Sequence, residues 1–390
     1  MALKRSTRKR ATKNNSKNSQ KNSENQVKEA SSGVKNKSVE PKEFVSTGCT
    51  LVNLAYSDRA RGGYQVGRIY NEIGDSSSGK SLKAWSTMAE AANNPEFDDY
   101  TLIYDDVECA SCFDVKKLFG NKLYERLTLP NMMKLSELME REEFEKIEDA
   151  SSNYIQDFHM NVKDFIDQKK PFIYILDSFD ALDSWDDEKK INKARAARKE
   201  GNEPSTGSYG TSKAKVASSI LRDIKRSLKN TNSILIIISQ VRDNLNAMAF
   251  GSKKTRSGGK ALKFYSTVEA WLALGKQIKS KERMIGVNTI LKTGKCRITG
   301  KLRSVEFPIY YDLGIDDVTA NIEFLMKEKH WKGSGQNLKA PEFEFEGSKK
   351  SLIKHIEQNN LEEDLKDIVE KVWLEIEESL KLDWRKKRYE

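Results

Sequence analysis

The segment "GDSSSGKS", residues 74–81, decides the fold. It matches G-x-x-x-x-G-K-[ST], in which glycines let consecutive backbone N–H groups point at phosphate oxygens and a helix N-terminus adds positive potential. "GRIYNEIG", residues 67–74, predicts a strand before the loop, and "KSLKAWSTMAEAAN", residues 80–93, has the apolar spacing of a helix after it. Strand, loop and helix in this order predict a phosphate-binding loop made of Gly74, Asp75, Ser76, Ser77, Ser78, Gly79, Lys80 and Ser81.

The polar residues of this loop have distinct roles in holding a nucleoside triphosphate with Mg²⁺. Lys80 would reach the β- and γ-phosphates, and the Ser81 hydroxyl would bind the metal. Asp177 ends the apolar segment "FIYILD", and the carboxyl end of a parallel strand faces the crevice where ligands bind. We therefore expect Asp177 to hold Mg²⁺ through water; the alternative is a helix cap after the strand.

Hydrolysis also needs a group that activates water. "YDDVECASC" supplies Asp105, Asp106 and Glu108 at the end of the next predicted strand, and any one of them could act as general base. Spacing alone does not choose among the three. Gln240 ends the apolar segment "SILIIISQ", where its amide would either hydrogen-bond a γ-phosphate and respond to its loss, or simply cap the strand end.

Apolar segments alternate with helical ones, which predicts an α/β fold with a mostly parallel sheet covered on both faces. Later strands are expected to be partly antiparallel, and the last 50 or so residues read as a small helical unit. We expect helices at about 130–168 and at 213–230, and strands at 100–106, 171–178, 233–240, 267–276, 286–294 and 305–314. The stretch 183–213 is polar and shows no clear periodicity. The predicted domains are a basic tail (1–43), an ATPase core (44–318) and a C-terminal α-rich domain (319–390).

Composition narrows the class of protein. The chain has 390 residues, 32% of them charged, and a net charge of +10, which favours polyanionic partners such as nucleic acid. Residues 1–43 hold 12 Lys/Arg against four Glu with few apolar residues, so we expect a disordered tail, either a DNA tether or a solubilising extension. A transit peptide is a weaker alternative because the segment lacks an amphipathic face. No run of 18 apolar residues occurs, so no membrane span is expected, and four scattered cysteines indicate free thiols.

Several segments, in the same order, resemble the RecA family of homologous recombinases, which includes the phage relative UvsX. They are "STGCTLVNLAYSDRARGGYQVGRIYNEIGDSSSGKS", "YDDVE", "YILDSFDAL", "SGGKALKFYSTVEAW" and "VEFPIYYDLGI". The resemblance covers about residues 44–385, and "SGGKALKFYSTV" is its most specific part. It implies a RecA-like core, ATP and Mg²⁺ as ligands, single- and double-stranded DNA as partners, and a helical homo-oligomer. It further implies the cytoplasm of a bacterial or phage-infected cell, with a loader or single-strand-binding protein as a further partner.

The resemblance assigns roles to particular residues. Glu108 matches the catalytic carboxylate, and Gln240 matches a switch that links the γ-phosphate to a second DNA-binding loop, here about 241–262. Lys295 and Arg297 match a basic pair that reaches the γ-phosphate of a neighbouring subunit; without the resemblance they would be ordinary exposed strand residues. The resemblance also implies DNA contacts in the second DNA-binding loop, in which cations bind phosphates and apolar side chains wedge between bases. These residues are Arg242, Met248, Phe250, Lys253, Lys254, Arg256, Gly258, Gly259 and Lys260.

The sequence also departs from the family. The usual docking element before the core is not visible, and Val115, with Phe113 nearby, occupies the position expected to stack on adenine. The stretch 183–213, matching a first DNA-binding loop, is longer than in bacterial RecA. Rival hypotheses are a RecA-fold motor such as a helicase or clock-type ATPase, and a recombinase paralogue that loads or caps filaments. The missing docking element favours the paralogue, whereas the complete set of nucleotide-site residues argues against it, and a motor gives no reason for "SGGKALKFY". The leading hypothesis is a DNA-dependent ATPase that pairs and exchanges strands.

Overall fold

The computed structural model describes residues 43–109, 114–131, 151–201, 211–243, 254–256, 259–386 and 388–389. The chain divides after Glu43, and residues 44–390 form one unit. The predicted basic tail, except Glu43, lies outside the described residues. Among the described residues, no helix combines the length and the apolar character that a membrane span requires.

The unit is built on a ten-stranded sheet in the order β12-β11-β10-β9-β3-β7-β6-β4-β5, with β8 paired to β7. The strands from β9 to β5 in that order run parallel, and β10, β11 and β12 continue the sheet antiparallel. The predicted α/β class with a mostly parallel sheet is therefore confirmed. The strands are β3 (Arg68–Gly74), β4 (Thr101–Asp106), β5 (Leu127–Thr128), β6 (Phe172–Asp177), β7 (Ile234–Asp243), β8 (Lys254–Arg256), β9 (Val268–Ser280), β10 (Arg283–Cys296), β11 (Ser304–Tyr310) and β12 (Gly314–Ile315).

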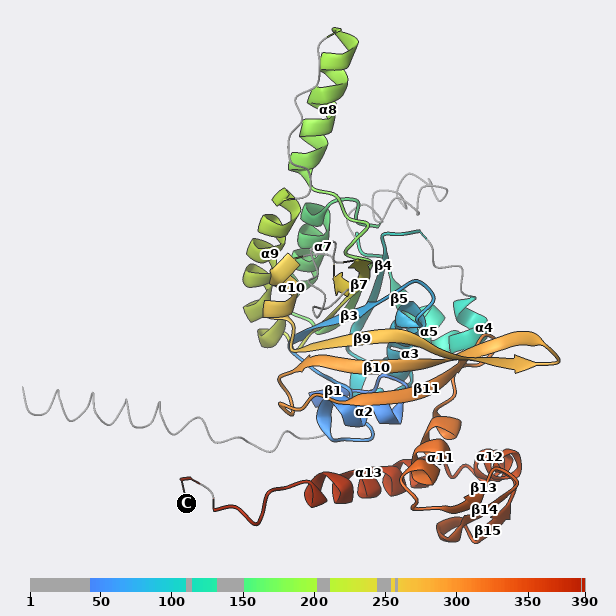
Figure 1. The fold of residues 1–390 in the computed structure, drawn as a ribbon. Helices are drawn as coiled ribbons and strands as arrows, with labels where there is room; N and C mark the ends of the chain where they lie inside the picture. Colours follow the sequence, from blue (N-terminus) through green and yellow to red (C-terminus); the bar gives the residue numbers. More distant parts are fainter. Residues whose placement is uncertain are drawn as a thin grey trace, which may run out of the picture. The chain divides into compact units, whose positions relative to one another are not determined.

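Helices cover both faces of this sheet (Figure 1). In the sequence most of these helices lie between consecutive strands, as the alternating pattern predicts. The helices of the core are α2 (Thr50–Ser57), α3 (Lys80–Asn93), η2 (Pro95–Phe97), α4 (Val115–Phe119), α5 (Asn121–Arg126), α7 (Ile155–Asp167), α8 (Trp185–Lys199), α9 (Thr211–Asn230) and α10 (Gly259–Tyr265). A separate two-stranded antiparallel sheet pairs β1 (Phe44–Val45) with β2 (Tyr64–Gln65), with α2 between them in the chain.

Strand β7 shows why the sheet is covered on both sides. Ile234, Ile236 and Ile238 point into the cluster that contains α2 and α3, whereas Leu235 and Ile237 point into the cluster that contains α7 and α9. All five are fully buried. Since successive side chains of a strand alternate between faces, a continuous apolar run requires two cores, and each such side chain contributes about 1.5–3 kcal/mol on burial.

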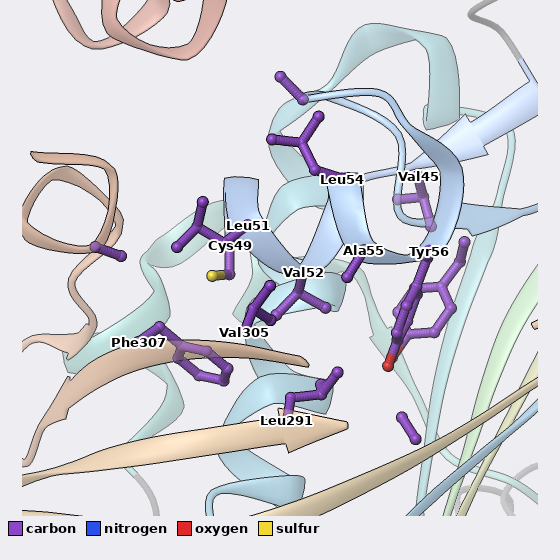
Figure 2. Packing of buried hydrophobic residues seen from close by; sticks show 14 of the residues in the cluster. Val45, Cys49, Leu51, Val52, Leu54, Ala55, Tyr56, Leu291, Val305 and Phe307 are labelled. Carbon is purple, nitrogen blue, oxygen red and sulfur yellow. The ribbon is translucent and has the colours of Figure 1, made fainter. Parts of the chain in front are cut away.

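Helix α2 covers the antiparallel part of the sheet. Figure 2 shows Leu51 and Val52 above Leu291 of β10 and Val305 and Phe307 of β11. These residues pack into the same core as α3. The antiparallel strands are thereby fixed beside the phosphate loop, where they form one wall of the nucleotide pocket described below.

The C-terminal part contains the expected helices and also a small sheet. Strands of three or four mainly polar residues form this sheet, so no apolar pattern predicts it. Its elements are α11 (Asp317–Lys327), β13 (Lys332–Ser334), β14 (Asn337–Ala340), η4 (Pro341–Phe343), β15 (Phe345–Gly347), α12 (Lys349–Gln358) and α13 (Glu362–Ser379). The proposed boundary at 318/319 falls in the first turn of α11.

The polar stretch 183–213, which shows no clear periodicity, contains α8. Ser184 caps this helix by accepting a hydrogen bond from the Asp187 backbone, and acidic residues occupy its first turn while Arg198 and Lys199 occupy its last. Asp187 is the single buried side chain in α8. Capping and charge placement favour this helix without an apolar face, which is why a periodicity argument misses it.

Candidate nucleotide and DNA site

The phosphate loop joins the carboxyl end of β3 to the N-terminus of α3, as predicted. Ser77 and Gly79 adopt left-handed backbone angles, with φ of 62° and 91°. A Cβ on Gly79 would lie 2.5 Å from Ile309 Cδ1, and a Cβ on Gly74 would lie 2.6 Å from the Leu272 carbonyl oxygen. The loop therefore requires glycine at both positions, and its turns form a concavity of backbone N–H groups suited to an anion.

Two buried side chains of the loop fit a phosphate ligand. Lys80 is 8% exposed and its Nζ donates to the Asp75 carbonyl oxygen at 2.7 Å. Burial lowers the pKa of Lys80, while the Asp177 and Glu108 carboxylates oppose that shift. Ser78 Oγ is buried, and within the described part of the chain it has no hydrogen-bond partner. A buried cation beside an unsatisfied hydroxyl is an arrangement that phosphate oxygens would complete.

Ser81 and Asp177 meet at the predicted metal position. Ser81 hydrogen-bonds the Asp177 carboxyl group, and Tyr104 OH donates to Asp177 Oδ2 at 2.6 Å. Burial raises the pKa of Asp177, these hydrogen bonds lower it, and nearby Glu108 raises it further. One carboxylate and one hydroxyl are the protein ligands that Mg²⁺ takes when phosphates and water supply the rest of its octahedron. The residues present therefore fit Mg²⁺ bound to a nucleotide.

Glu108 and Gln240 are in direct contact, although 132 positions separate them in the sequence. Gln240 Nε2 donates to Glu108 Oε1 at 2.7 Å, and Ser178 Oγ donates to the same oxygen. The Gln240 backbone N–H donates to Asp180 Oδ2 at 2.6 Å. A side-chain hydrogen bond thus connects Gln240 of β7 to the turn after β4, across the carboxyl end of β6.

The structure separates the three acidic candidates for general base. Asp105 is fully buried and accepts hydrogen bonds from the Ser152 backbone at 2.9 Å and from Tyr174 OH at 2.6 Å. It points away from the nucleotide pocket, and burial raises the pKa of its carboxyl group. Asp106 and Glu108 line the pocket. The geometry therefore removes Asp105 and keeps Asp106 and Glu108, of which Glu108 is exposed and held by Gln240.

These residues line one pocket of about 390 Å³. Besides the loop and the acids, its wall includes Val287 of β10, Ile309 of β11 and the half-exposed Tyr311, which sequence reasoning missed. The detectable signal is an aromatic residue directly after the apolar segment "VEFPIY", but only the pairing of β10 with β11 brings it to the loop. Val115, expected near adenine, is not among the lining residues, and Phe113 lies outside the described residues.

Lys295 and Arg297 are not at the pocket of their own chain. Lys295 Nζ donates to the carbonyl oxygens of Phe264 at 3.2 Å and Ser266 at 2.6 Å, at the end of α10. Arg297 N donates to the Thr267 carbonyl oxygen at 2.9 Å, beside the start of β3. The phosphate loop follows the other end of that strand, about 20 Å away at 3.3 Å per residue. Neither side chain can therefore reach a phosphate in the same chain's pocket.

The predicted DNA contacts that the structure describes lie on β7 beyond Gln240, on β8 and at the start of α10. Beyond Gln240, β7 extends through Arg242 and pairs antiparallel with β8, which contains Lys254 and Arg256. Gly259 and Lys260 begin α10, where Lys260 is exposed. Met248, Phe250, Lys253 and Gly258 lie outside the described residues. One strand thus leads directly from the Glu108 contact into the predicted DNA-binding segment.

The comparisons with known proteins concern part of this architecture. Residues 195–316 match the RecA N-terminal domain family. The chain is 34% identical over 126 residues to Protein RecA of Rickettsia prowazekii and 33% identical over 124 residues to Protein RecA of Clostridioides difficile. These matches cover 31% and 30% of this chain and 37% and 35% of the relatives.

The chain thus spans about a third of the length of the curated relatives it matches. The matched family segment contains β7, Gln240, the segment 241–262, Lys295 and Arg297, while the phosphate loop, Glu108 and Asp177 lie before it. The site around the loop is therefore supported by geometry rather than by this match. Residues 195–316 are therefore similar to the RecA N-terminal domain, in agreement with the resemblance that the sequence motifs indicate.

Proposed function

We propose that the protein is a DNA-dependent ATPase that assembles on single-stranded DNA, searches duplex DNA for homology and exchanges strands. The contact between Gln240 and Glu108 carries this proposal. It places the amide that leads into the basic segment 241–262 on the carboxylate that lines the nucleotide pocket. A change at the γ-phosphate would then alter the position of the segment that meets DNA. The similarity of residues 195–316 to the RecA N-terminal domain supports recombination and repair, in the cytoplasm with the DNA, as the process that this coupling would serve.

Each polar residue of the pocket would have its own role in hydrolysis. Bound MgATP would supply the electrophilic phosphorus and a metal ion that neutralises developing charge. Lys80 would bind the β- and γ-phosphates from the loop, and Ser81 with Asp177 would hold the metal. Glu108 Oε would orient the attacking water and accept its proton. Its position at the pocket rim, two residues beyond β4, leaves room for that water.

The apolar wall beside the loop would bind the nucleoside. Tyr311 presents a half-exposed ring, and Val287 and Ile309 provide aliphatic surface beside it. Aromatic and aliphatic contacts suit a purine, whose faces are apolar and whose polar groups lie at its edge.

Lys295 and Arg297 give the proposal an oligomeric form. Because they lie about 20 Å from their own phosphate loop, they can act on a γ-phosphate only across a subunit interface. The exposed Phe264, whose carbonyl oxygen accepts from Lys295, lies beside them and is 64% exposed. An exposed aromatic residue next to two cations is suited to contact with another subunit. A head-to-tail filament on DNA would satisfy this requirement.

The test is steady-state ATP hydrolysis with and without single-stranded DNA, alongside Lys80→Ala. We expect DNA to raise turnover severalfold in the natural protein, and Lys80→Ala to abolish turnover while DNA binding remains. DNA binding is measured separately by fluorescence anisotropy. Tight DNA binding with negligible turnover would indicate a mediator or filament cap, and strand unwinding by a preformed ring would indicate a motor. Either result would refute strand exchange as the activity.

A further inference from the structure

A second pocket, of about 540 Å³, lies at the edge of the sheet opposite the nucleotide site. It is formed by the start of β3, the second half of α9 and the segment that joins α10 to β9. Of its eleven lining residues six are cations and none is a carboxylate. We call this pocket the α9 basic groove. Its six cations are Arg68, Arg222, Lys225, Arg226, Lys229 and Arg297.

Helix geometry brings four of these cations to one side of α9. Arg222, Lys225, Arg226 and Lys229 follow the i, i+3, i+4, i+7 spacing, so they share one stripe of the helix. The acid within that stretch, Asp223, is turned toward α7, where it contacts His159 Nε2 at 2.9 Å and Lys163 Nζ at 3.8 Å. The groove thus concentrates positive charge and excludes the neighbouring negative one.

Within the described residues, no ion pair neutralises Lys225, Arg226 or Lys229. Cations at i and i+4 repel and destabilise a helix by a few tenths of a kcal/mol per pair. The helix dipole favours cations only in the last turn of α9, so it accounts for Lys229 but not for Arg222. Such a stripe therefore costs helix stability and is better explained by an anionic ligand.

The form of the groove favours a polymer over a small anion. Its α9 cations are exposed, so no buried pocket encloses a single phosphate. Many exposed cations bind a polyanion through several weak contacts and the release of counterions, without shape selection. From Arg222 to Lys229 the helix rises by about 10 Å. Consecutive phosphates of one strand that lie along this length would meet several of these side chains.

Its position separates the groove from the segment 241–262. Tyr265 lines the groove at the end of α10, and Arg222 Nε donates to its hydroxyl at 3.3 Å. The other end of α10 begins at Gly259, inside the predicted DNA-binding segment. We propose that the four α9 cations of the α9 basic groove bind the phosphodiester backbone of nucleic acid as a separate contact, distinct from the role proposed above for Arg297. This inference rests on the proposed function in that DNA is the ligand.

The experiment measures the salt dependence of binding to a fluorescent single-stranded oligonucleotide, without ATP. The triple variant Lys225→Ala/Arg226→Ala/Lys229→Ala is compared with Lys350→Ala/Lys354→Ala/Lys371→Ala, which removes three exposed cations from α12 and α13. We expect the slope of log K against log salt to become shallower by about 2 in the groove variant, since each lost contact to a single strand contributes about 0.7. The control variant should keep the slope of the natural protein.

The conservative variant Lys225→Arg/Arg226→Lys/Lys229→Arg should also keep the full slope, because it retains every charge. If the natural protein binds DNA and the groove variant has the same slope as the control, the inference is wrong and the proposed function stands. If the natural protein does not bind DNA at all, the proposed function fails, and the groove loses its ligand with it. Circular dichroism of each variant checks that the fold is intact.

Discussion

Gln240 Nε2 donates to Glu108 Oε1 at 2.7 Å, so a neutral amide holds the carboxylate that we propose as the general base. The amide belongs to β7, which continues past it into the predicted DNA-binding segment, and the carboxylate follows β4 by two residues, with β6 between the two strands. Because Glu108 accepts from the Gln240 amide, a γ-phosphate that draws this amide toward itself would weaken that contact. We propose that nucleotide binding and the position of β7 beyond Gln240 are coupled through this hydrogen bond.

Replacing Glu108 by Gln should abolish hydrolysis while ATP binding persists. The amide keeps the size of the side chain but cannot accept a proton from water, and loss of a general base costs about 10²–10⁴-fold in kcat. Single-turnover hydrolysis and equilibrium binding of ATP measure the two effects. Asp105→Asn is the control for the rival carboxylate, with turnover retained in whatever fraction folds. Unchanged kcat in Glu108→Gln would show that another group is the base.

Replacing Gln240 by Ala should uncouple hydrolysis from DNA. Without the amide, Glu108 keeps the hydrogen bond from Ser178, so basal turnover should fall by less than in Glu108→Gln. DNA stimulation should disappear because nothing then links the pocket to the segment 241–262. The ratio of kcat with and without DNA measures this coupling. If that ratio stays at the value of the natural protein, Gln240 does not transmit the signal.

Strand alternation explains which site residues the sequence could predict. The phosphate loop, Lys80, Ser81 and Asp177 follow from local patterns because each depends on one strand end or helix start. Asp105 and Glu108 look equivalent in sequence, yet Asp105 lies within β4 and points to the α7 side, while Glu108 lies beyond it. Only side-chain direction separates them, and the resemblance to RecA had to supply that choice.

Longer-range features escaped prediction for a different reason. Tyr311 reaches the pocket through the pairing of β10 with β11, which no local pattern specifies. The groove cations Arg68 and Arg297 come from separate strands and meet α9 only in three dimensions. The α8 helix has no buried face, so it carries no periodic signal. What could be predicted was local geometry; what could not was contact between distant segments.

Metal-dependent nucleotide binding should strengthen as pH rises through the pKa of Asp177. Burial raises this pKa above the usual 3.8, so the protonated carboxyl group persists to higher pH than in an exposed aspartate. Mg²⁺ requires the ionised form, and protons therefore compete with the metal at low pH. Titrating Mg²⁺ in the presence of ATP at several pH values measures the effect. Asp177→Asn should weaken binding and remove this pH dependence; an unchanged profile would show that another group titrates.

Replacing Tyr311 by Ala should weaken ATP binding while hydrolysis of bound nucleotide persists. The ring lines the pocket and supplies no acid, base or metal ligand to the proposed chemistry, so the loss should appear in Kd or KM, by about 1 kcal/mol or five- to tenfold. Tyr311→Phe keeps the ring and should bind nearly as well. A fall in kcat with KM unchanged would place Tyr311 in the chemical step instead.

The buried pair between Glu72 and Lys83 should govern stability of the strand and helix that flank the phosphate loop. Lys83 Nζ lies 3.0 Å from Glu72 Oε1, and the two side chains are 1% and 2% exposed. Tyr56 OH and Tyr64 OH donate to the same oxygen at 2.9 and 2.7 Å. Glu72→Gln leaves the ammonium group buried without its partner, which should lower the free energy of unfolding by about 3–5 kcal/mol.

The pH dependence of that loss identifies its cause. Burial lowers the pKa of Lys83 below the usual 10.5, and removal of Glu72 takes away the charge that opposes this shift. A lysine with a depressed pKa favours the folded state more as pH rises toward its unfolded value, so the destabilisation should shrink in alkaline solution. Glu72→Gln/Lys83→Met removes both charges and should recover most of the stability at neutral pH.

The surface variant Glu346→Gln, which breaks an exposed pair with Lys339, is the matched control. Denaturant unfolding at two pH values compares the three variants. Because an exposed pair gains little in water, Glu346→Gln should change stability by less than about 1 kcal/mol. If Glu72→Gln proves no more destabilising than this control, water or a shifted side chain solvates Lys83, and the pair does not hold β3 against α3.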